Sequence, residues 1–171
     1  MAKQNTLKTI LGFFQSVLRR RVAFLNRHNS LEDIYNYVAI DGLYATSGQP
    51  NEQQFDLIQQ AGFTTVINLA PTSMLENSVV EEEAILKRLG IEYIHIPVDF
   101  KDPTDSDFDQ FVSALDDRET QSVWVHRAAN MRVSAFTYRY RRQILNHDTN
   151  KAKLDLNKIW EPFGVWNSFV D

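Results

Sequence analysis

The chain reads Val123-Trp124-Val125-His126-Arg127-Ala128-Ala129-Asn130-Met131-Arg132-Val133-Ser134 between residues 123 and 134. The first three residues form an apolar run typical of a short buried strand, and the spacing of apolar residues from about Val133 to Leu145 predicts a helix. The turn between them, residues 126–132, brings backbone N–H groups to the start of that helix. We expect a phosphate or similar oxyanion to bind there, because the helix dipole favours negative charge and Arg132 offers a bidentate donor.

Strands and helices alternate ahead of this segment. The expected strands cover residues 65–69 and 91–98, and the expected helices cover residues 51–61, 79–89 and 106–117. Residues 37–40 and 43–46 are predicted to form a hairpin around Asp41-Gly42, a dipeptide favoured in tight turns. The alternation predicts an α/β fold with a mainly parallel, twisted sheet flanked by helices, in which ligands bind at the carboxyl ends of the strands.

The remaining segments have simpler interpretations. Residues 146–152 are predicted to form a polar loop, and the tail is predicted to pack onto the domain through its aromatic residues Trp160, Phe163, Trp166 and Phe169. The triplet Glu81, Glu82 and Glu83 opens a predicted helix, and we interpret it as charge that stabilises the helix dipole. Aspartates at 99, 102, 105, 107 and 109 lack the glycine and terminal glutamate of an EF-hand loop, so no metal site is expected.

Composition limits the chemistry. With 171 residues, the chain is long enough for one domain with a sizeable core, which we place at residues 31–171. It contains no cysteine, and this excludes disulfides and any mechanism that needs a protein thiol. The net charge is −4, so we expect no nucleic-acid partner, whose binding depends on neutralising phosphates.

The N-terminal arm has the opposite charge. Residues 1–28 contain six basic residues and no acidic one, and apolar residues from Leu7 to Leu25 recur at helical spacing, so residues 1–30 are predicted to form a basic amphipathic helix. Its apolar stripe either covers the core of the domain or lets residues 6–28 contact an anionic membrane surface or a protein partner. No apolar run approaches the roughly 20 residues that span a bilayer, and a signal-peptide pattern is missing. We expect a cytoplasmic protein that is either free or peripherally attached to a membrane.

The 126–132 loop resembles a known signature. Its strand, loop and helix are similar to those of the cysteine-dependent protein tyrosine and dual-specificity phosphatases, which read His-Cys, several residues, Arg, and Ser or Thr nearby. Leu-Tyr-Ala-Thr-Ser-Gly-Gln-Pro at 43–50 and Ala-Gly-Phe-Thr-Thr-Val-Ile-Asn-Leu at 61–69 resemble the small bacterial phosphatases related to beta-lactamase hydrolase-like proteins. The resemblance covers about residues 37–145 and implies a phosphatase-like fold without a cofactor.

The resemblance also implies roles for individual residues. Arg132 would be the phosphate-binding arginine, and the residues that present donors to the oxyanion would be Arg127, Ala128, Ala129, Asn130, Met131 and Arg132. His126 would hold the loop by hydrogen bonds, and Ser134 would supply the hydroxyl that stabilises a leaving thiolate. Asp99 would be the general acid, with Asp102 as the competing candidate.

Two departures from the signature change the expected function. Arg127 stands at the position of the nucleophilic cysteine, and its protonated guanidinium has no lone pair with which to attack phosphorus. The loop also has four rather than five residues between position 127 and Arg132, and in this it resembles both the small bacterial phosphatases and the rhodanese sulfurtransferases. We expect a pseudophosphatase, or an inactivated phosphatase, that binds phosphate, sulfate or a phosphorylated ligand. The alternatives are a membrane or partner adaptor and a degenerate sulfurtransferase, and the sequence leaves open whether Arg127 binds the anion or fills the pocket.

Overall fold

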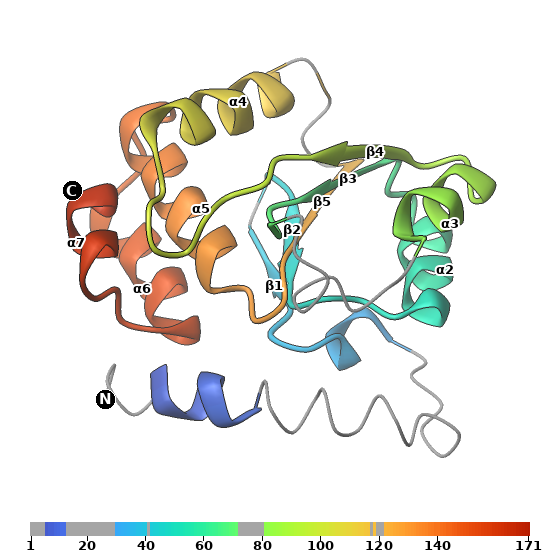
Figure 1. Ribbon diagram of the computed structural model, residues 1–171, viewed down its shortest axis with the longest axis horizontal. Coiled ribbons are helices and arrows are strands. Elements are labelled where there is room, and N and C mark those ends of the chain that lie inside the picture. Colours follow the sequence, from blue (N-terminus) through green and yellow to red (C-terminus); the bar gives the residue numbers. More distant parts are fainter. Residues whose placement is uncertain (1–5, 13–29, 41, 72–80, 117, 119–121) are drawn as a thin grey trace.

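The computed structural model describes residues 6–12, 30–40, 42–71, 81–116, 118 and 122–171 (Figure 1). The strands are β1 (Val38–Ala39), β2 (Ala45–Ser47), β3 (Thr65–Asn68), β4 (Glu92–His95) and β5 (Val123–His126). The helices are the 3-10 turn η1 (Leu31–Asp33), α2 (Glu52–Gln60), α3 (Glu82–Arg88), α4 (Asp105–Asp116), α5 (Met131–Gln143), α6 (Thr149–Ile159) and α7 (Val165–Val170).

The five strands form one sheet in the order β1-β2-β5-β3-β4. β5 lies at its centre and pairs in parallel with β2 and β3, β3 pairs in parallel with β4, and only the β1–β2 pair is antiparallel. The mainly parallel α/β sheet is therefore confirmed. The hairpin is confirmed as well, with Val38 opposite Thr46, and Gly42 provides a positive φ of 69° in the turn. Asp41 lies outside the described residues.

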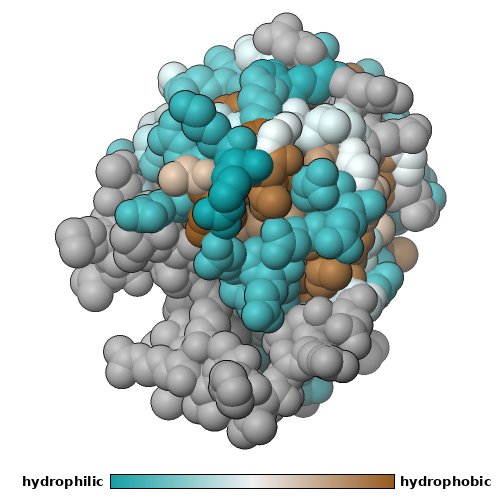
Figure 2. Space-filling view, turned by 90° about the vertical axis from the view of Figure 1, so that its right-hand side faces the viewer, coloured by the Kyte–Doolittle hydropathy of each residue, from teal (hydrophilic) through white to brown (hydrophobic). Residues whose placement is uncertain are grey.

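Helices cover both faces of the sheet. In Figure 1, α2 and α3 lie on one side, and α4, α5, α6 and α7 lie on the other. Successive β5 side chains point alternately into these two layers, because side chains alternate along a strand. Trp124 packs with Phe55 and Ile58 of α2, whereas Val123 and Val125 belong to the larger core on the α5 side. The α2–α3 side presents a mainly hydrophilic outer face (Figure 2), where Arg88 and Glu52 form an ion pair of 2.7 Å.

The ends of the helices follow their capping residues. Asn51 and Gln54 form the capping box that begins α2, as an N-cap at Asn51 predicts. Helix α5 begins at Met131, two residues before the predicted start, after Asn130 adopts a left-handed φ of 61°. Strand β4 is shorter than the predicted strand 91–98. The described part of α3 begins at Glu82, and residues 79 and 80 of the predicted helix lie outside the described residues.

The prediction of a loop at residues 146–152 is wrong beyond Asp148. The Asp148 carboxylate accepts a hydrogen bond of 2.9 Å from the backbone N–H of Lys151 and caps α6, which starts at Thr149. Three α6 residues spaced by four and three face the core, namely Ala152, Leu156 and Ile159. The lysines on the outer face of the helix obscured this apolar stripe.

The tail packs onto the domain as predicted. Trp160 and Trp166 are fully buried, and the Trp166 indole donates a hydrogen bond of 2.9 Å to the Phe100 carbonyl. Phe163 remains partly exposed. The tail thereby fastens the segment that follows β4 to the α5 side of the sheet.

The described part of the N-terminal arm, residues 6–12, is helical and lies beside the end of α6 (Figure 1). The Thr9 hydroxyl donates to the Ile159 carbonyl, and the Tyr35 hydroxyl donates to the Thr9 carbonyl at 2.5 Å. Leu7 and Leu11 keep 60% and 55% of their surface exposed. Residues 1–5 and 13–29 of the predicted helix lie outside the described residues. In the part of the chain that is described, no helix has the length and hydropathy that crossing a membrane requires.

Candidate functional site

The 126–132 loop connects the central strand to α5, and every residue in it is buried. Two backbone hydrogen bonds hold it against the segment that follows β2. The Arg127 N–H donates to the Ser47 carbonyl at 3.3 Å, and the Gln49 N–H donates to the Ala128 carbonyl at 3.4 Å. The residues predicted to surround an oxyanion therefore lie at the carboxyl end of the sheet, where ligands of open α/β sheets bind.

Asn130 shapes this loop. Its backbone N–H donates to the Arg127 carbonyl at 3.1 Å and closes a turn. Its side-chain amide donates to the Asn36 carbonyl at 2.7 Å and to the Thr46 hydroxyl at 3.0 Å, and the Asn36 amide donates in return to the Ala129 carbonyl at 3.0 Å. The donors of Asn130 are thus engaged within the protein, so its role in the structure is to hold the loop.

Gly48 allows the neighbouring segment to approach closely. A Cβ atom at this position would lie 2.8 Å from the Tyr35 ring, 2.9 Å from the Tyr35 carbonyl and 3.0 Å from the Ala128 carbonyl. Two of these three atoms are backbone and cannot swing away. Only glycine fits between Tyr35 and the 126–132 loop.

Positive charge gathers where α5 begins. Arg127 and Arg132 are both buried, and the first turn of this 13-residue helix contains no acidic residue. Arg132 is only 1% exposed, and its guanidinium carbon lies 5.4 Å from the centre of the Phe100 ring. The helix dipole adds to the potential of the two guanidiniums. The arrangement can attract an anion.

Asp99, the predicted general acid, is next in sequence to a residue that contacts Arg132. It immediately precedes Phe100, the residue that packs on Arg132. The Asp99 carboxylate is exposed and accepts a hydrogen bond of 2.9 Å from the Lys101 N–H. Asp102 is exposed in the same segment. The structure therefore brings the Asp99 segment to the arginine of the loop.

Ser134 lies one turn into α5, and its hydroxyl is used inside the domain. The hydroxyl donates to the Met131 carbonyl at 2.9 Å and accepts from the Trp160 indole at 3.1 Å. These contacts join the start of α5 to the tail. Ser134 is thereby fixed between two structural partners.

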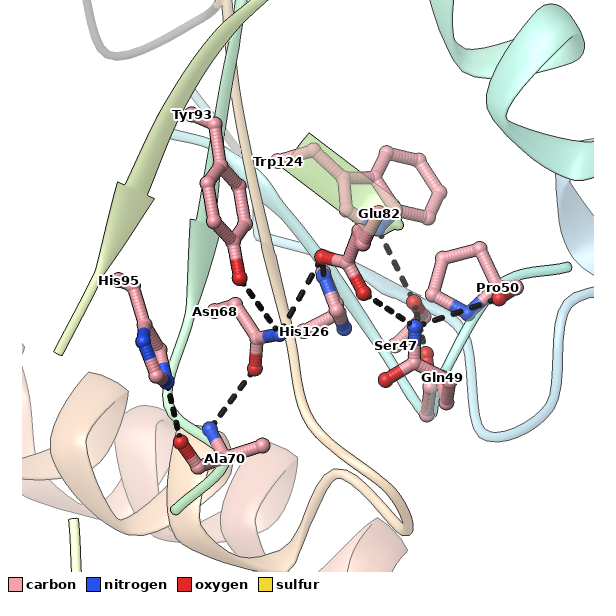
Figure 3. Close-up of polar contacts among 11 residues, drawn as sticks. Ser47, Gln49, Pro50, Asn68, Ala70, Glu82, Tyr93, His95, Trp124 and His126 are labelled. Carbon is pink, nitrogen blue, oxygen red and sulfur yellow. Dashed lines mark hydrogen bonds and ion pairs between the residues drawn. The ribbon is translucent and has the colours of Figure 1, made fainter. Parts of the chain in front are cut away.

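Glu82 is the site residue that sequence reasoning missed. It is 6% exposed, and its Oε1 lies 2.8 Å from Nε2 of His126 and accepts from the Asn68 amide at 3.2 Å, while Oε2 accepts from the Gln49 amide at 2.8 Å (Figure 3). Glu82 does lie in the first turn of α3, as expected of charge that stabilises the helix dipole, but its burial and its three hydrogen bonds give it a further role that this interpretation missed. A signal was present, because Ile85 and Leu86 follow Glu82 at the three- and four-residue spacing that places all three on one helix face.

The environment of Glu82 favours its charged form. Burial by itself would raise the pKa of the Glu82 carboxyl, but the charge of His126 and the hydrogen bonds from His126, Gln49 and Asn68 outweigh burial and lower that pKa below its ordinary value of 4.5. Tyr93, whose hydroxyl accepts from the Asn68 amide at 3.2 Å, has its pKa raised to about 12, first by burial and then by Glu82. Glu82 is therefore a carboxylate at neutral pH. Among the described residues, no group of three or more His, Asp and Glu side chains gathers as metal ligands would.

Comparison with known proteins identifies what the chain is similar to. A family model described as DSP-PTPase phosphatase fused to NAD+ kinase matches residues 14–162. A beta-lactamase hydrolase-like protein of Xylella fastidiosa (strain Temecula1) is 34% identical over 91 residues, which cover 52% of this chain and 21% of that protein. The chain thus spans about a fifth of the length of this relative.

Solved structures show the same fold. The crystal structure of a candidate phosphatase (DUF442) from Shewanella putrefaciens CN-32 matches with a TM-score of 0.70 and 33% identity, covering 82% of this chain and 91% of that one. The core catalytic domain of the PP-IP phosphatase SIW14 from S. cerevisiae matches with a TM-score of 0.66 at 14% identity, covering 80% and 84%. The second likeness concerns the fold alone. The resemblance seen in the sequence is confirmed at the level of the family.

We predict that Glu82→Gln destabilises the protein by about 2 kcal/mol at neutral pH, the size expected for lost charge-assisted hydrogen bonds. A carboxyl whose folded-state pKa is lowered stabilises the fold above its unfolded-state pKa, and this contribution disappears as pH falls through the folded-state value. The difference in free energy of unfolding between wild type and variant should therefore shrink below pH 4.5. Urea denaturation over a pH series measures it.

The control for this prediction is Glu83→Gln, which removes the neighbouring, exposed carboxylate. We expect it to change stability by a few tenths of a kcal/mol, as exposed helix charges do. A difference between wild type and Glu82→Gln that stays constant through the acidic range would contradict the role of the Glu82 charge.

Proposed function

Because this chain belongs to the family described as DSP-PTPase phosphatase fused to NAD+ kinase, we propose that it is a phosphatase-family protein whose 126–132 loop binds phosphate or a similar oxyanion without hydrolysing it. The observation that carries the proposal is the pair of buried guanidiniums, Arg127 and Arg132, at an α5 N-terminus whose first turn is free of acidic residues. Helix N-termini and arginines are the usual donors to bound phosphate.

The absence of cysteine supports a binding rather than a catalytic role. Covalent phosphoryl transfer by this family requires a thiolate, and the chain has none. Position 127, which the resemblance assigns to the nucleophile, holds a guanidinium that donates hydrogen bonds and cannot attack phosphorus. The same absence removes the persulfide carrier that a sulfurtransferase would need. Retention of the cradle together with loss of the nucleophile is the pattern of a pseudophosphatase.

The ligand class follows from the donors. Phosphate and sulfate are tetrahedral dianions that match a loop of N–H groups flanked by guanidiniums. The family description adds a nucleotide to the set of ligands to be tested, because NAD+ kinase produces NADP+, which carries one more phosphate than NAD+. NADP+ is therefore a further ligand to titrate by calorimetry beside inorganic phosphate, with NAD+ as its control.

We predict that Arg132→Ala weakens binding of inorganic phosphate and of sulfate about tenfold or more, the loss expected for charge-assisted hydrogen bonds. Arg132→Lys retains the charge but loses the planar fork, so it should fall between the alanine variant and wild type. Isothermal titration calorimetry measures the three affinities.

The matched control is Arg142→Ala, which removes a guanidinium from the last turn of the same helix. Its phosphate affinity should equal that of wild type. If wild type binds neither anion, or if Arg132→Ala and Arg142→Ala behave alike, the proposed anion site is wrong.

We predict that the wild-type protein does not hydrolyse aryl phosphates and that Arg127→Cys gains this activity, because a thiolate would then face the anion site. In the Arg127→Cys background, Asp99→Asn should lower kcat about a hundredfold, the usual contribution of a general acid. Asp102→Asn in the same background is the control and should have little effect. A larger loss with Asp102→Asn would transfer the acid role to Asp102, and an inactive but folded Arg127→Cys variant would place the function outside phosphate chemistry.

A second candidate function is attachment to an anionic membrane surface through the N-terminal arm. Leu7 and Leu11 are exposed, and Leu7 lines a cleft of about 480 Å³ together with Ile10 and Phe163. Residues 1–28 contribute six positive charges, and each basic residue near an anionic surface adds about 1 kcal/mol of attraction. Apolar side chains next to basic ones are typical of helices that lie in a membrane interface.

We predict that the protein co-sediments with phosphatidylserine vesicles and not with phosphatidylcholine vesicles, and that Leu7→Ser combined with Leu11→Ser abolishes this binding. Leu154→Ser is the matched control, because Leu154 is a similarly exposed leucine on α6. Equal sedimentation of the double variant and wild type would exclude the arm as a membrane anchor.

A further inference from the structure

We propose that Glu82 is a positioning residue for the 126–132 loop and that it acts through His126 and Gln49. This inference rests on the proposed function, because it concerns how the same loop is held. Glu82 lies on α3, far in sequence from the loop, and takes no part in the motif by which the family is recognised.

The contacts of Glu82 join three segments that meet at the carboxyl end of the sheet. Its carboxylate receives hydrogen bonds from His126 at the end of β5, Asn68 at the end of β3 and Gln49 after β2, at 2.8, 3.2 and 2.8 Å (Figure 3). Both oxygens are occupied, and the side chain is nearly fully buried. One carboxylate thus fixes the relative positions of three chain segments.

Two of these contacts lead directly to the loop. His126 is the residue immediately before Arg127, and its ring is completely buried with an edge against Phe55 at 5.9 Å between ring centres. Gln49 donates its side-chain amide to Glu82 and its backbone N–H to the Ala128 carbonyl. A shift of Glu82 would therefore displace His126 and, through Gln49, Ala128, the two residues on either side of Arg127.

The hydrogen-bond pattern also assigns the proton of the imidazole. A carboxylate only accepts hydrogen bonds, so the proton between Glu82 and His126 is carried by Nε2. Nδ1 is buried and has no hydrogen-bond partner. The hydrogen bond to Glu82 is therefore what fixes the orientation of the imidazole.

The experiment titrates the full-length protein with sulfate at neutral pH, where Glu82 is a carboxylate. Glu82→Ala should bind sulfate about tenfold or more weakly than wild type, because the loop loses its support.

Glu82→Gln tests whether a side chain of the same shape rescues the position of the loop. The amide of Gln49 can rotate to pair with its carboxamide, so the loop keeps its place. We expect Glu82→Gln to bind sulfate more tightly than Glu82→Ala does, whereas the control Glu83→Gln should behave as wild type. Sulfate binding by Glu82→Ala at the wild-type level, or binding by Glu82→Gln as weak as that of Glu82→Ala, would overturn the proposal.

Hydrogen exchange tests the positioning role independently of any ligand. In Glu82→Ala, the amides of residues 126–132 should exchange about tenfold or more faster, as expected when local supporting contacts are lost, while the amides of α4 keep their wild-type rates. Unchanged exchange in the loop would overturn the positioning role. If wild type binds no sulfate but loop exchange responds to Glu82→Ala, the proposed anion binding is wrong while the positioning role stands.

Discussion

Strand β5 hydrogen-bonds to a parallel neighbour on each side, and this constraint decides where every part of the site lies. The loop that follows β5 can emerge only between the ends of β2 and β3. The residues after those strands, Gln49 and the Asn68 side chain, are therefore brought beside His126 before any specific contact is considered. Parallel strands that share one carboxyl edge turn three distant sequence segments into one site.

Burial makes this arrangement demanding. The whole 126–132 loop is buried, so its polar groups need partners. Asn130 meets part of this need by bonding to Asn36 and Thr46, and Glu82 meets another part by accepting from His126 and Gln49. A carboxylate buried without such donors would be strongly destabilising. Glu82 is stable in its charged form only because three donors converge on it.

The structure separates the scaffold of a phosphatase from its chemistry. The fold and the Asp99 segment against Arg132 are properties of the scaffold, and they do not depend on which residue occupies position 127. A thiol is a property of a single side chain. An exchange at that one position alters the chemistry and leaves the hydrogen bonds of position 127 with Ser47 and Asn130 in place, since these are made by its backbone. This explains how the family fold can be retained without the thiol.

The local sequence pattern was sufficient to predict the elements that depend on residues close together in the sequence. Apolar periodicity predicted the α/β order, Asn51 predicted the start of α2, Asp41-Gly42 predicted the hairpin, and the strand–loop–helix run predicted a loop at the start of α5. Helix α6 was not predicted because lysines on its solvent-exposed face masked its apolar stripe of three residues. The role of Glu82 was not predicted because a glutamate at the start of a helix has the same local sequence pattern whether it is solvated or buried. Only the packing of α3 over the ends of three strands decided that this carboxylate faces His126, since hydrogen bonds between residues 44 positions apart depend on the assembled sheet and not on neighbours in the sequence.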